Sequence, residues 1–485
     1  MTVPSAGGPV TLASLAARGR VHLVGVGGAG MSAVAALLAS RGLVVSGSDA
    51  SARALPAVES AGVLVFGGHA AGNVDGAGTV VVSTAIRESN PELARARDLG
   101  IPVLHRSEAL AALLAEHRSV AVAGAHGKTT TSAMVAVTLA SAGLDPSWAI
   151  GGTVRTAVGA SDEGATGAPV PASAPDPVGG AHLGAGPVMV VEADESDGSF
   201  LAYHPQIAVV TNVEPDHLDH YGSREAFEQA FVDFASTVTD ALVVCADDPG
   251  SRRLAEQVRS TGRRLLTYGN DPQADVVLGT WEPDGSGGST TICEQGGVPV
   301  DLHLQVPGTH NALNAAAAWT VARLLGVPGE LAAAGLARFA GTGRRFDDRG
   351  TAAGVRVVDD YAHHPTEVAA LLRAARSATG GRVLVLFQPH LYSRTLSFAG
   401  PFAEALELAD AVVVTDVYAA REEPDPAVTG ALITDRMHAG VFVADRHEAA
   451  RVLADQAVAG DLLLTVGAGD VTDLGPEILA RLRER

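Results

Sequence analysis

Hydrophobic residues along the chain follow two alternating patterns. Short runs of Val, Ile, Leu and Ala are followed by longer Ala- and Leu-rich stretches in which apolar residues recur with a helical period. Short apolar runs are typical of strands buried on both faces of a parallel sheet, and the longer stretches are typical of the helices that connect such strands. The pattern therefore predicts an α/β protein made of repeated strand–helix units.

The pattern recurs in three blocks along the sequence. In the first block we expect strands at residues 21–26, 43–46 and 80–83. In the second we expect strands at 119–123, 188–191 and 207–210, and helices at 312–325 and 330–337. In the third we expect strands at 355–359, 382–387, 411–415 and 461–466.

The length of the chain indicates that these blocks are separate domains, because a single hydrophobic core stops growing well below 485 residues. We expect a tail and three α/β domains, over residues 1–19, 20–117, 118–341 and 342–485. Residues 159–187 are dominated by Gly, Ala, Pro and Ser, which bury too little apolar surface to offset their ordering entropy, so we interpret them as a flexible insertion. The glycines at 341–343 suit a hinge or, equally well, an ordinary turn.

Composition and charge narrow the class of protein. The formal net charge of -20, without a basic stripe, disfavours binding to nucleic acid or to an anionic membrane. Cys245 and Cys293 lack the spacing of a metal site or a disulfide framework, which fits a reducing compartment. The first 20 residues lack the pattern of a signal peptide, and no apolar run reaches the roughly 18 residues of a membrane span. We therefore expect a cytoplasmic protein.

A glycine-rich turn follows the first expected strand. Gly25, Gly27 and Gly30 form GxGxxG directly before a helical run, where free backbone amides and a helix N-terminus can bind phosphate. Asp49 follows the second strand, where a carboxylate can accept a hydrogen bond from a ribose hydroxyl. Taken alone, this pattern favours a dinucleotide such as NAD, or a glycine turn without a ligand.

A second glycine loop opens the central block. It follows an apolar strand, precedes a helix and consists of Gly124, Ala125, His126, Gly127, Lys128, Thr129 and Thr130. Compared with the Walker A pattern it has two residues between its glycines instead of four, but its chemistry is the same. Backbone amides surround phosphate oxygens, Lys128 neutralises the β- and γ-phosphates, and the Thr129 hydroxyl can bind magnesium. The segment therefore predicts ATP and Mg²⁺ as cofactors.

Lys128 is the only lysine in the sequence, and the other basic side chains are arginines. A compact ammonium group fits inside a closed loop of amides, whereas a planar guanidinium does not. Acidic runs follow two nearby strands, at residues 192–197 and 214–219. Acidic groups at the carboxyl ends of strands beside such a loop are suited to hold magnesium, although they could also be solvated loop charges.

An ordered series of motifs, covering nearly the whole chain from Val21 onward, resembles the Mur ligases. The series is HLVGVGGAGMS, GSD, VVSTAIRESNPE, IPVLHR, GAHGKTTT, EADESDGSF, TNVEPDHLDHY, PGTHNALNAAAA, GRRFD, DDYAHHPTEV, FQPHLYSRT and DVYAAREEP. The resemblance implies a Rossmann-like N-terminal domain that holds a UDP-sugar, a central P-loop domain that binds ATP, and a Rossmann-like C-terminal domain that brings the amino acid.

The resemblance also implies roles for residues at matching positions. The UDP-sugar, in place of NAD, would contact Gly25, Gly27, Gly28, Gly30, Asp49, Ser83, Thr84, His105 and Arg106. The adenine nucleotide would contact residues 124–130 together with Asn311 and Asn314. Thr129 and Glu192 would hold one magnesium ion, and His217 would bind a second. Lys128, Arg345, Arg394, His363 and His364 would carry the catalytic charges, although a His pair before a proline is also often a helix cap.

The implied activity is an ATP-dependent ligation in peptidoglycan precursor synthesis. L-alanine would be joined to the lactyl carboxylate of UDP-N-acetylmuramate through an acyl phosphate, by a monomer or homodimer. Several Mur ligases carry a carbamylated lysine that this chain cannot supply, and the alanine-adding branch also lacks it. Leu391 replaces an arginine of many relatives in the QPH segment, which places more of the cationic role on Arg394.

Three other functions would use parts of the same pattern. A recycling ligase would join UDP-N-acetylmuramate to a preformed tripeptide and would need a wider amino-acid pocket. A NAD-dependent dehydrogenase would explain the first glycine turn but would leave the P-loop unused. A binding protein regulated by ATP hydrolysis would ligate nothing.

The solitary lysine permits a direct test by amine-selective labelling, with Lys128 and the N-terminus as the two amine targets. Because bound phosphates would cover the ammonium group, magnesium-ATP should protect Lys128 and leave the N-terminal amine reactive as an internal control. Lys128→Arg should abolish ligation although the charge is kept. Peptide mapping by mass spectrometry measures the labelling. Equal labelling of Lys128 with and without saturating nucleotide would contradict its phosphate role.

Overall fold

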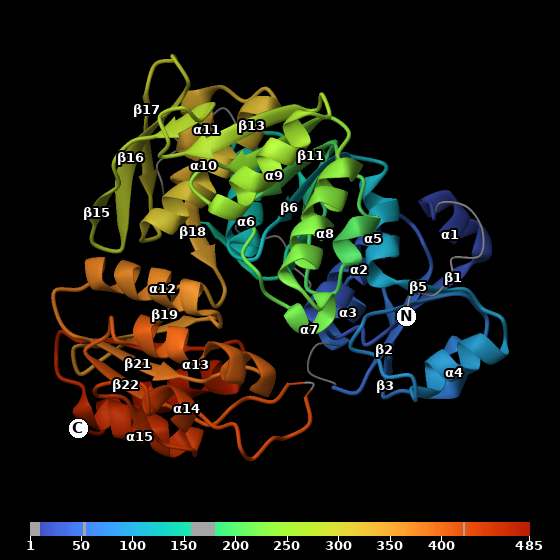
Figure 1. Ribbon diagram of the computed structural model, residues 1–485. Coiled ribbons are helices and arrows are strands. Elements are labelled where there is room, and N and C mark those ends of the chain that lie inside the picture. Colours follow the sequence, from blue (N-terminus) through green and yellow to red (C-terminus); the bar gives the residue numbers. More distant parts are fainter. Residues whose placement is uncertain (1–9, 52–54, 157–179, 421) are drawn as a thin grey trace. The chain divides into compact units, whose positions relative to one another are not determined.

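The computed structural model describes residues 10–51, 55–156, 180–420 and 422–485, and its elements are labelled in Figure 1. Its contacts form two compact units. The first unit comprises residues 1–278, 292–300 and 313–338, and the second comprises 279–291, 301–312 and 339–485. Each unit contains parallel strands with connecting helices, so the predicted α/β class is confirmed. The exact bounds of the three expected domains stay a prediction.

The N-terminal part of the first unit is built on a parallel sheet with the strand order β3-β2-β1-β4-β5. Its strands are β1 (Arg20–Val24), β2 (Val45–Asp49), β3 (Leu64–Gly67), β4 (Ala77–Val82) and β5 (Val103–His105). Its helices are α1 (Leu12–Arg18), α2 (Ala29–Ser40), α3 (Leu55–Ser60), α4 (Pro91–Asp98) and α5 (Arg106–Leu114). The strand order reverses between β1 and β4, and the carboxyl ends of strands at such a point are where α/β sheets bind ligands.

The strand expected at 43–46 instead begins at Val45 and continues to Asp49. Val44 is 66% exposed, whereas Ser46 and Ser48 are fully buried. The small residues are buried because the neighbouring chain approaches closely: a Cβ added at Gly47 would lie 2.6 Å from the Cβ of Val26. Hydrophobicity therefore misplaced this strand, since close packing selects small residues at its centre.

The central part of the first unit has the strand order β14-β13-β12-β11-β6-β10-β7-β9, and β9 is antiparallel to its neighbour. The strands are β6 (Arg118–Ala123), β7 (Ser147–Ala149), β9 (Ala181–His182), β10 (Val188–Glu192), β11 (Ile207–Val210), β12 (Ala241–Cys245), β13 (Arg264–Gly269) and β14 (Val276–Leu278). A short strand β8 (Val154–Thr156) precedes the undescribed stretch. β6 lies between β10 and β11, so the P-loop after β6 emerges between the two acidic runs.

Helices of the central part complete its core. They are α6 (Lys128–Ser141), α7 (Leu218–Tyr221), α8 (Arg224–Thr237), α9 (Pro249–Arg259), α10 (Thr309–Leu324) and α11 (Gly329–Leu336). Aromatic side chains at Phe200, Phe227, Phe231 and Phe234 are fully buried and pack against one another. α6 is buried along most of its length, with α11 packed against it at Gly335 and Thr138. The P-loop helix is therefore held rigidly by its own core.

Part of the predicted insertion at 159–187 is packed against the first unit. Residues 159–179 lie outside the described residues. From Gly180 onward, however, the backbone enters β9, and the His182 ring stacks on Trp148 with ring centroids 4.2 Å apart. A Cβ at Gly184 or Gly186 would overlap backbone carbonyl oxygens of Asp145 or Leu144. Residues 180–187 are therefore closely packed, which glycine permits, and flexibility of the insertion as a whole stays a prediction.

The second unit contains a sheet with the order β19-β20-β24-β21-β22-β23, in which only β19 is antiparallel to its neighbour. Its strands are β19 (Asp347–Ala352), β20 (Val355–Asp360), β21 (Val383–Phe387), β22 (Ala411–Val414), β23 (Val441–Phe442) and β24 (Leu462–Val466). One hydrophobic cluster joins the sheet to α12 (Pro365–Ser377), α13 (Tyr392–Leu406) and α14 (Ala431–Thr434), and another joins it to α15 (Arg446–Gln456) and α16 (Gly475–Arg483). The two clusters show that helices cover both faces.

Further strands follow β14 in the sequence. They are β15 (Glu282–Asp284), β16 (Gly287–Glu294), β17 (Val300–Leu304) and β18 (Phe339–Thr342). β15, β16 and β17 extend the central sheet, and β18 pairs with β8. The expected hinge at 341–343 begins at the end of β18, where Gly341 has a φ of +109°. That backbone conformation favours glycine in a turn, and hinge motion stays a prediction.

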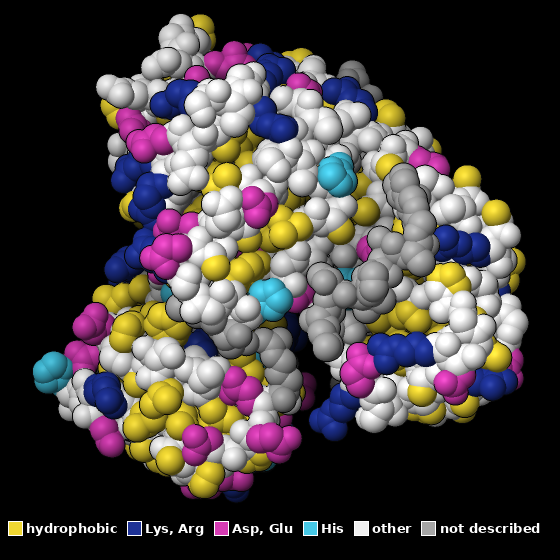
Figure 2. Space-filling view, turned by 45° about the vertical axis from the view of Figure 1, so that its right-hand side comes forward, with side chains coloured by type: hydrophobic (Ala, Val, Ile, Leu, Met, Phe, Trp, Pro, Cys, Tyr) yellow, Lys and Arg dark blue, Asp and Glu magenta, His cyan; other side chains and the backbone are white. Residues whose placement is uncertain are grey.

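On the face shown in Figure 2, basic and acidic side chains are interspersed over the surface. This distribution agrees with the absence of a basic stripe in the sequence. Among the residues that the structure describes, none of the helices has the length and apolarity that a membrane span requires.

A pair of strand glycines tests how closely α1 packs on the N-terminal sheet. A Cβ at Gly78 in β4 would overlap the backbone carbonyl of Arg18, whereas a Cβ at Gly67 in β3 would meet nothing within 4 Å. Gly78→Ala should therefore lower stability by about 1–3 kcal/mol, because overpacking forces the backbone to shift. Gly67→Ala is the matched control and should be close to neutral. Thermal unfolding measures both, and equal losses would contradict the close contact at Gly78.

Candidate active site

The P-loop is held in shape by the end of the neighbouring strand β11. Gly124 and Gly127 have φ values of +133° and +83°, which glycine adopts without strain. A Cβ at Gly124 would overlap the hydroxyl of Thr211. Thr211 Oγ1 donates to the carbonyl of His126 at 2.6 Å, and the His126 amide donates to Asn212 Oδ1 at 2.9 Å. The loop is thus fixed before α6 begins.

The first turn of α6 is suited to bind an anion. Its N-cap is Gly127, which supplies no side-chain cap to the helix amides. Backbone amides and the helix dipole at such an end attract phosphate. Thr129 and Thr130 follow directly in this turn, and Thr130 is almost completely buried. The geometry therefore agrees with the nucleotide role expected for residues 124–130.

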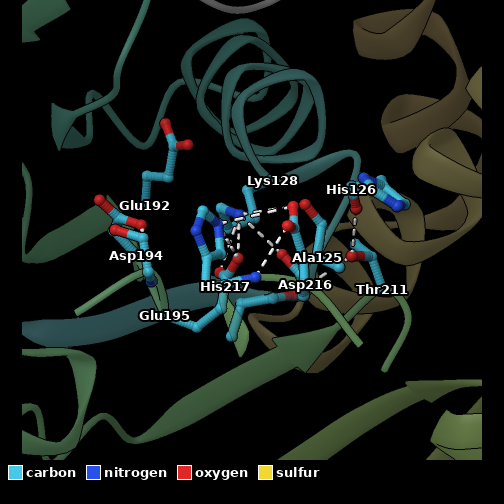
Figure 3. A network of polar contacts seen from close by, with 12 residues as sticks. Ala125, His126, Lys128, Glu192, Asp194, Glu195, Thr211, Asp216 and His217 are labelled. Carbon is cyan, nitrogen blue, oxygen red and sulfur yellow. Dashed lines mark hydrogen bonds and ion pairs between the residues drawn. The ribbon is translucent and has the colours of Figure 1, made fainter. Parts of the chain in front are cut away.

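Lys128 lies at the centre of this site (Figure 3). Its ammonium group donates to the carbonyl of Gly124 at 2.8 Å and lies 2.8 Å and 2.9 Å from the two carboxylate oxygens of Glu195. Burial lowers the pKa of Lys128, but the carboxylates of Glu195, Asp194 and Glu192 outweigh this effect and hold the pKa above its ordinary value. The pairing with these carboxylates therefore favours the charged form of Lys128.

Thr129 and Glu192 are brought together as the sequence predicted. Thr129 Oγ1 donates to Glu192 Oε1 at 2.9 Å, and Glu192 Oε2 accepts from the amide of Gly151 at 2.8 Å. A hydroxyl and a carboxylate beside a phosphate-binding loop are the oxygen donors that magnesium prefers. The donor set of these two residues therefore fits a magnesium ion.

His217 approaches the same site from the loop after β11. Its Nε2 lies 3.6 Å from Asp216 Oδ2 and 3.9 Å from Glu195 Oε1, so it faces the carboxylate that pairs with Lys128. The backbone of His217 has a φ of +52°, and its amide donates to Asp216 Oδ1 at 2.8 Å. A strained non-glycine backbone held by its own neighbour is common at functional sites. An imidazole between carboxylates can serve as a metal ligand.

The two asparagines of α10 differ in their surroundings. Asn314 lies beside the P-loop, because a Cβ at Gly127 would be 2.7 Å from Asn314 Oδ1. Asn311 belongs to the second unit, and its amide nitrogen donates to the carbonyl of Pro307 at 2.8 Å. Of the two asparagines, Asn314 is therefore the one that lies at the P-loop within the first unit.

The glycine turn after β1 is fixed by the end of β2. The amide of Gly25 donates to the carbonyl of Ser48 at 2.8 Å, and the amide of Gly27 donates to Asp49 Oδ2 at 2.9 Å. Asp49 Oδ1 accepts from the amide of Ser51 at 2.8 Å. The carboxylate expected to meet a ribose hydroxyl thus also holds the turn itself. Gly28 is the N-cap of α2 and supplies no side-chain cap to that helix.

The other residues predicted for the UDP-sugar lie at the same edge of the sheet. Ser83 and Thr84 follow β4, and His105 ends β5 and caps α5, whose first residue is Arg106. A Cβ at Gly30 would overlap the guanidinium of Arg106, so this cation lies against the first turn of α2. A cation and a helix N-terminus together form a site for a diphosphate.

The second unit groups two of its predicted cations around one carboxylate. Glu367 accepts from the amide of His363 at 2.9 Å and lies 3.2 Å from its Nδ1. Arg345 lies 3.6 Å from the same carboxylate, with its guanidinium over the ring of Tyr361. Arg394 is nearly buried, and its Nη1 lies 3.4 Å from His390 Nδ1.

His364 is oriented differently from His363. It is 2% exposed, caps α12 by accepting from the amide of Thr366 at 3.4 Å, and packs edge-on against Phe398. The sequence allowed either a catalytic role or a helix cap for the His363–His364 pair, and His364 has the geometry of a helix cap.

Several functional contacts were not evident from the sequence. Glu195 was one acid among several in its segment, and nothing local shows that it faces Lys128. Glu367 and His390 were not selected, although they organise Arg345, His363 and Arg394. The spacing of Glu367, four residues after His363 at a helix start, was the available signal.

Comparison with known proteins agrees with this arrangement. Three family models match the chain: "Mur ligase family, catalytic domain" over residues 20–118, "Mur ligase middle domain" over 122–322, and "Mur ligase, glutamate ligase domain" over 344–469. Together they span both glycine turns, the acidic runs and the cations of the second unit.

Individual relatives match over nearly the whole chain. The UDP-N-acetylmuramate–L-alanine ligase of Kineococcus radiotolerans is 55% identical over 478 residues, covering 96% of this chain and 97% of that protein. The protein of the same name from Renibacterium salmoninarum is 54% identical over 469 residues, covering 96% of each. The solved structure of UDP-N-acetylmuramate-alanine ligase MurC from Thermotoga maritima matches with a TM-score of 0.76 at 30% identity, covering 96% of this chain and 99% of that one. The chain belongs to the Mur ligase family.

Proposed function

We propose that this Mur ligase joins L-alanine to the lactyl carboxylate of UDP-N-acetylmuramate, with hydrolysis of ATP to ADP and phosphate. The observation that carries the proposal is the identity of 55% and 54%, over nearly the full length, to ligases named for these two substrates. The structure supports it with two glycine turns at helix N-termini, one for each phosphate-bearing substrate. A reaction that uses ATP and a nucleotide-linked sugar fits the cytoplasm.

The P-loop is the proposed nucleotide site. The amides at the start of α6 bind the phosphates, and the Lys128 ammonium group neutralises charge on the β- and γ-phosphates. Thr129 and Glu192 would hold one magnesium ion, and His217 would bind a second. When bound, magnesium neutralises the charge that develops on the transferred phosphoryl group. In this arrangement Lys128 keeps its position through the loop carbonyls and Glu195.

The proposed chemistry has two steps. In the first, a lactyl carboxylate oxygen attacks the γ-phosphorus, the bond to the ADP oxygen breaks, and an acyl phosphate forms. In the second, the alanine amine attacks the acyl carbon, phosphate leaves with the electrons of the carbon–oxygen bond, and the nitrogen loses a proton. Positioning and charge neutralisation dominate such transfers, since little covalent chemistry is left to the protein.

The cationic cluster of the second unit is suited to bind carboxylate or phosphate oxygens. Arg345 and His363 are held by the carboxylate of Glu367, and Arg394 is held beside His390. We assign Arg345, Arg394 and His363 to the negative charges of the acyl phosphate and of the amino acid. His364 contributes by starting α12 at the correct residue, directly after His363.

A recycling ligase specific for a tripeptide is the nearest alternative. The solved murein peptide ligase from Psychrobacter arcticus matches with a TM-score of 0.68 at 24% identity, which shows a shared fold. In contrast, relatives that are at least 50% identical to this chain carry names that specify L-alanine as the amino acid. Alanine is therefore the favoured amino acid.

Amine-dependent phosphate release tests the proposed function. With ATP, magnesium and UDP-N-acetylmuramate present, L-alanine should stimulate phosphate release strongly, and the product should contain one added alanine by mass. The matched controls omit UDP-N-acetylmuramate or replace alanine with the tripeptide. Stimulation by the tripeptide alone would indicate the recycling ligase, and phosphate release independent of any amine would indicate a nucleotide-hydrolysing binding protein.

The magnesium assignment predicts a graded effect of two substitutions. Glu192→Gln and His217→Ala should both raise the magnesium concentration needed for half-maximal rate. Glu192→Gln should raise it more, because it removes a charged ligand beside the P-loop. Asp233→Asn, at an exposed position of α8, is the control and should leave the magnesium titration unchanged. Unchanged titrations for both site variants would place the metal elsewhere. Binding of UDP-N-acetylmuramate should be largely retained.

A further inference from the structure

The acidic segment after β10 contacts two different sets of side chains. Glu192 and Glu195 face the P-loop through Thr129 and Lys128. The other two acids of the segment, Asp194 and Asp197, instead contact side chains that come from the carboxyl edge of the N-terminal sheet. These partners are Thr84, His105 and Arg106, which the sequence assigned to the UDP-sugar.

Asp194 holds the guanidinium of Arg106. The distance from Arg106 Nη2 to Asp194 Oδ2 is 3.1 Å. The same guanidinium lies against Gly30 in the first turn of α2. A long arginine side chain has many rotamers, and an ion pair at its tip selects among them. Asp194 thus keeps the cation beside the helix N-terminus where a diphosphate would bind.

Asp197 holds Thr84 in a comparable way. Thr84 Oγ1 donates to Asp197 Oδ2 at 3.1 Å, while Asp197 Oδ1 accepts from the amide of Ser199 at 3.0 Å. One oxygen of the carboxylate is therefore tied to its own loop and the other to the N-terminal sheet. The Asp197 side chain is only 13% exposed, whereas Thr84 is an exposed residue.

His105 points a hydrogen-bond donor toward the same carboxylate. Its Nδ1 accepts from the amide of Ser107 at 3.4 Å and lies 2.9 Å from the Ser107 hydroxyl oxygen, and acceptance from the amide favours the neutral tautomer with its proton on Nε2. Burial lowers the pKa of His105, which favours that neutral form. Nε2 is buried and makes no hydrogen bond within the described part of the chain, and it lies 3.8 Å from Asp197 Oδ2. That distance is too long for a hydrogen bond.

We propose that Asp197 is a positioning residue for the UDP-sugar site, with Asp194 acting on Arg106 in the same way. The inference rests on the proposed function. Asp197 accepts the proton of the Thr84 hydroxyl and so fixes the oxygen of Thr84 as an acceptor for a donor group of the UDP-sugar. In this proposal, the central part of the first unit completes a substrate site whose other residues come from the N-terminal sheet. The residues that do so belong to the acidic segment after β10, which also contacts the proposed nucleotide site.

A double-mutant cycle on binding tests this proposal. Thr84→Val, Asp197→Ala and the double variant are titrated with UDP-N-acetylmuramate by calorimetry, without ATP or alanine. Each single change should weaken binding by about fivefold to tenfold, the typical net worth of one hydrogen bond. The double variant should bind no more weakly than the weaker single variant, because both changes remove the same interaction. Independent, multiplying losses would overturn the proposal.

Further measurements separate positioning from general damage and from a wrong function. Affinity for ATP and the melting temperature should stay at wild-type values in Asp197→Ala, as in the exposed control Asp233→Ala. An equal loss of ATP affinity would overturn the proposal. If Asp197→Ala fails to fold, Asp197→Asn takes its place, since its amide oxygen can still accept from Ser199. Absence of UDP-N-acetylmuramate binding to the wild-type protein would overturn the proposed function together with this inference, whereas multiplying losses would overturn the inference alone.

Discussion

The ion pair between Lys128 and Glu195 is the interaction on which the first unit's site depends. A buried charge is tolerated only when it is paired and hydrogen-bonded, and Glu195 is completely buried. Burial raises the pKa of Glu195, and the ammonium group of Lys128 opposes that rise. The carbonyl of Glu195 also accepts from the hydroxyl of Tyr221 at 2.5 Å, which joins the acidic segment to α7. The P-loop, the acidic segment and the loop bearing His217 therefore hold one another in place.

The same acidic segment explains how one short stretch can serve two substrates. Its backbone is fixed at Glu195, so the neighbouring carboxylates are directed to opposite sides: Glu192 to Thr129, and Asp197 to Thr84. The effect of a substitution in this segment on activity can therefore arise from either substrate site and not from the nucleotide site alone. Asp194 acts electrostatically on Lys128 and also pairs with Arg106. Of the four acidic residues in the segment, it is therefore the one whose effects on the two sites are hardest to separate. Asp197 contacts Thr84 and the amide of Ser199 in its own loop, and it gives the cleaner experiment.

The sequence predicted features that depend on local spacing. Apolar runs located most strands, and the glycine loop with Lys128 located the proposed nucleotide site, because both patterns are contained within a few consecutive residues. The pairing of Lys128 with Glu195 and of Asp49 with Gly27 depends on how separate loops approach one another, which local spacing does not encode. The close packing of residues 180–187 was not evident from their glycine-rich composition for a related reason. Glycine permits flexibility in a free loop and close packing in a tight one, and only the neighbouring backbone distinguishes the two.

The charges of the site explain why both glycine turns lie at helix N-termini. The chain carries a formal net charge of -20, yet its proposed substrates are anions. The principal cations, Lys128, Arg106 and Arg345, are each paired with a carboxylate, so each pair is close to neutral. Pairing fixes where a cation lies but removes much of its attraction for a phosphate. Backbone amides and helix dipoles at the two glycine turns supply further positive potential. Gly28 and Gly127 are the N-caps of α2 and α6 and supply no capping side chain, which leaves amides of these helix ends accessible to a ligand.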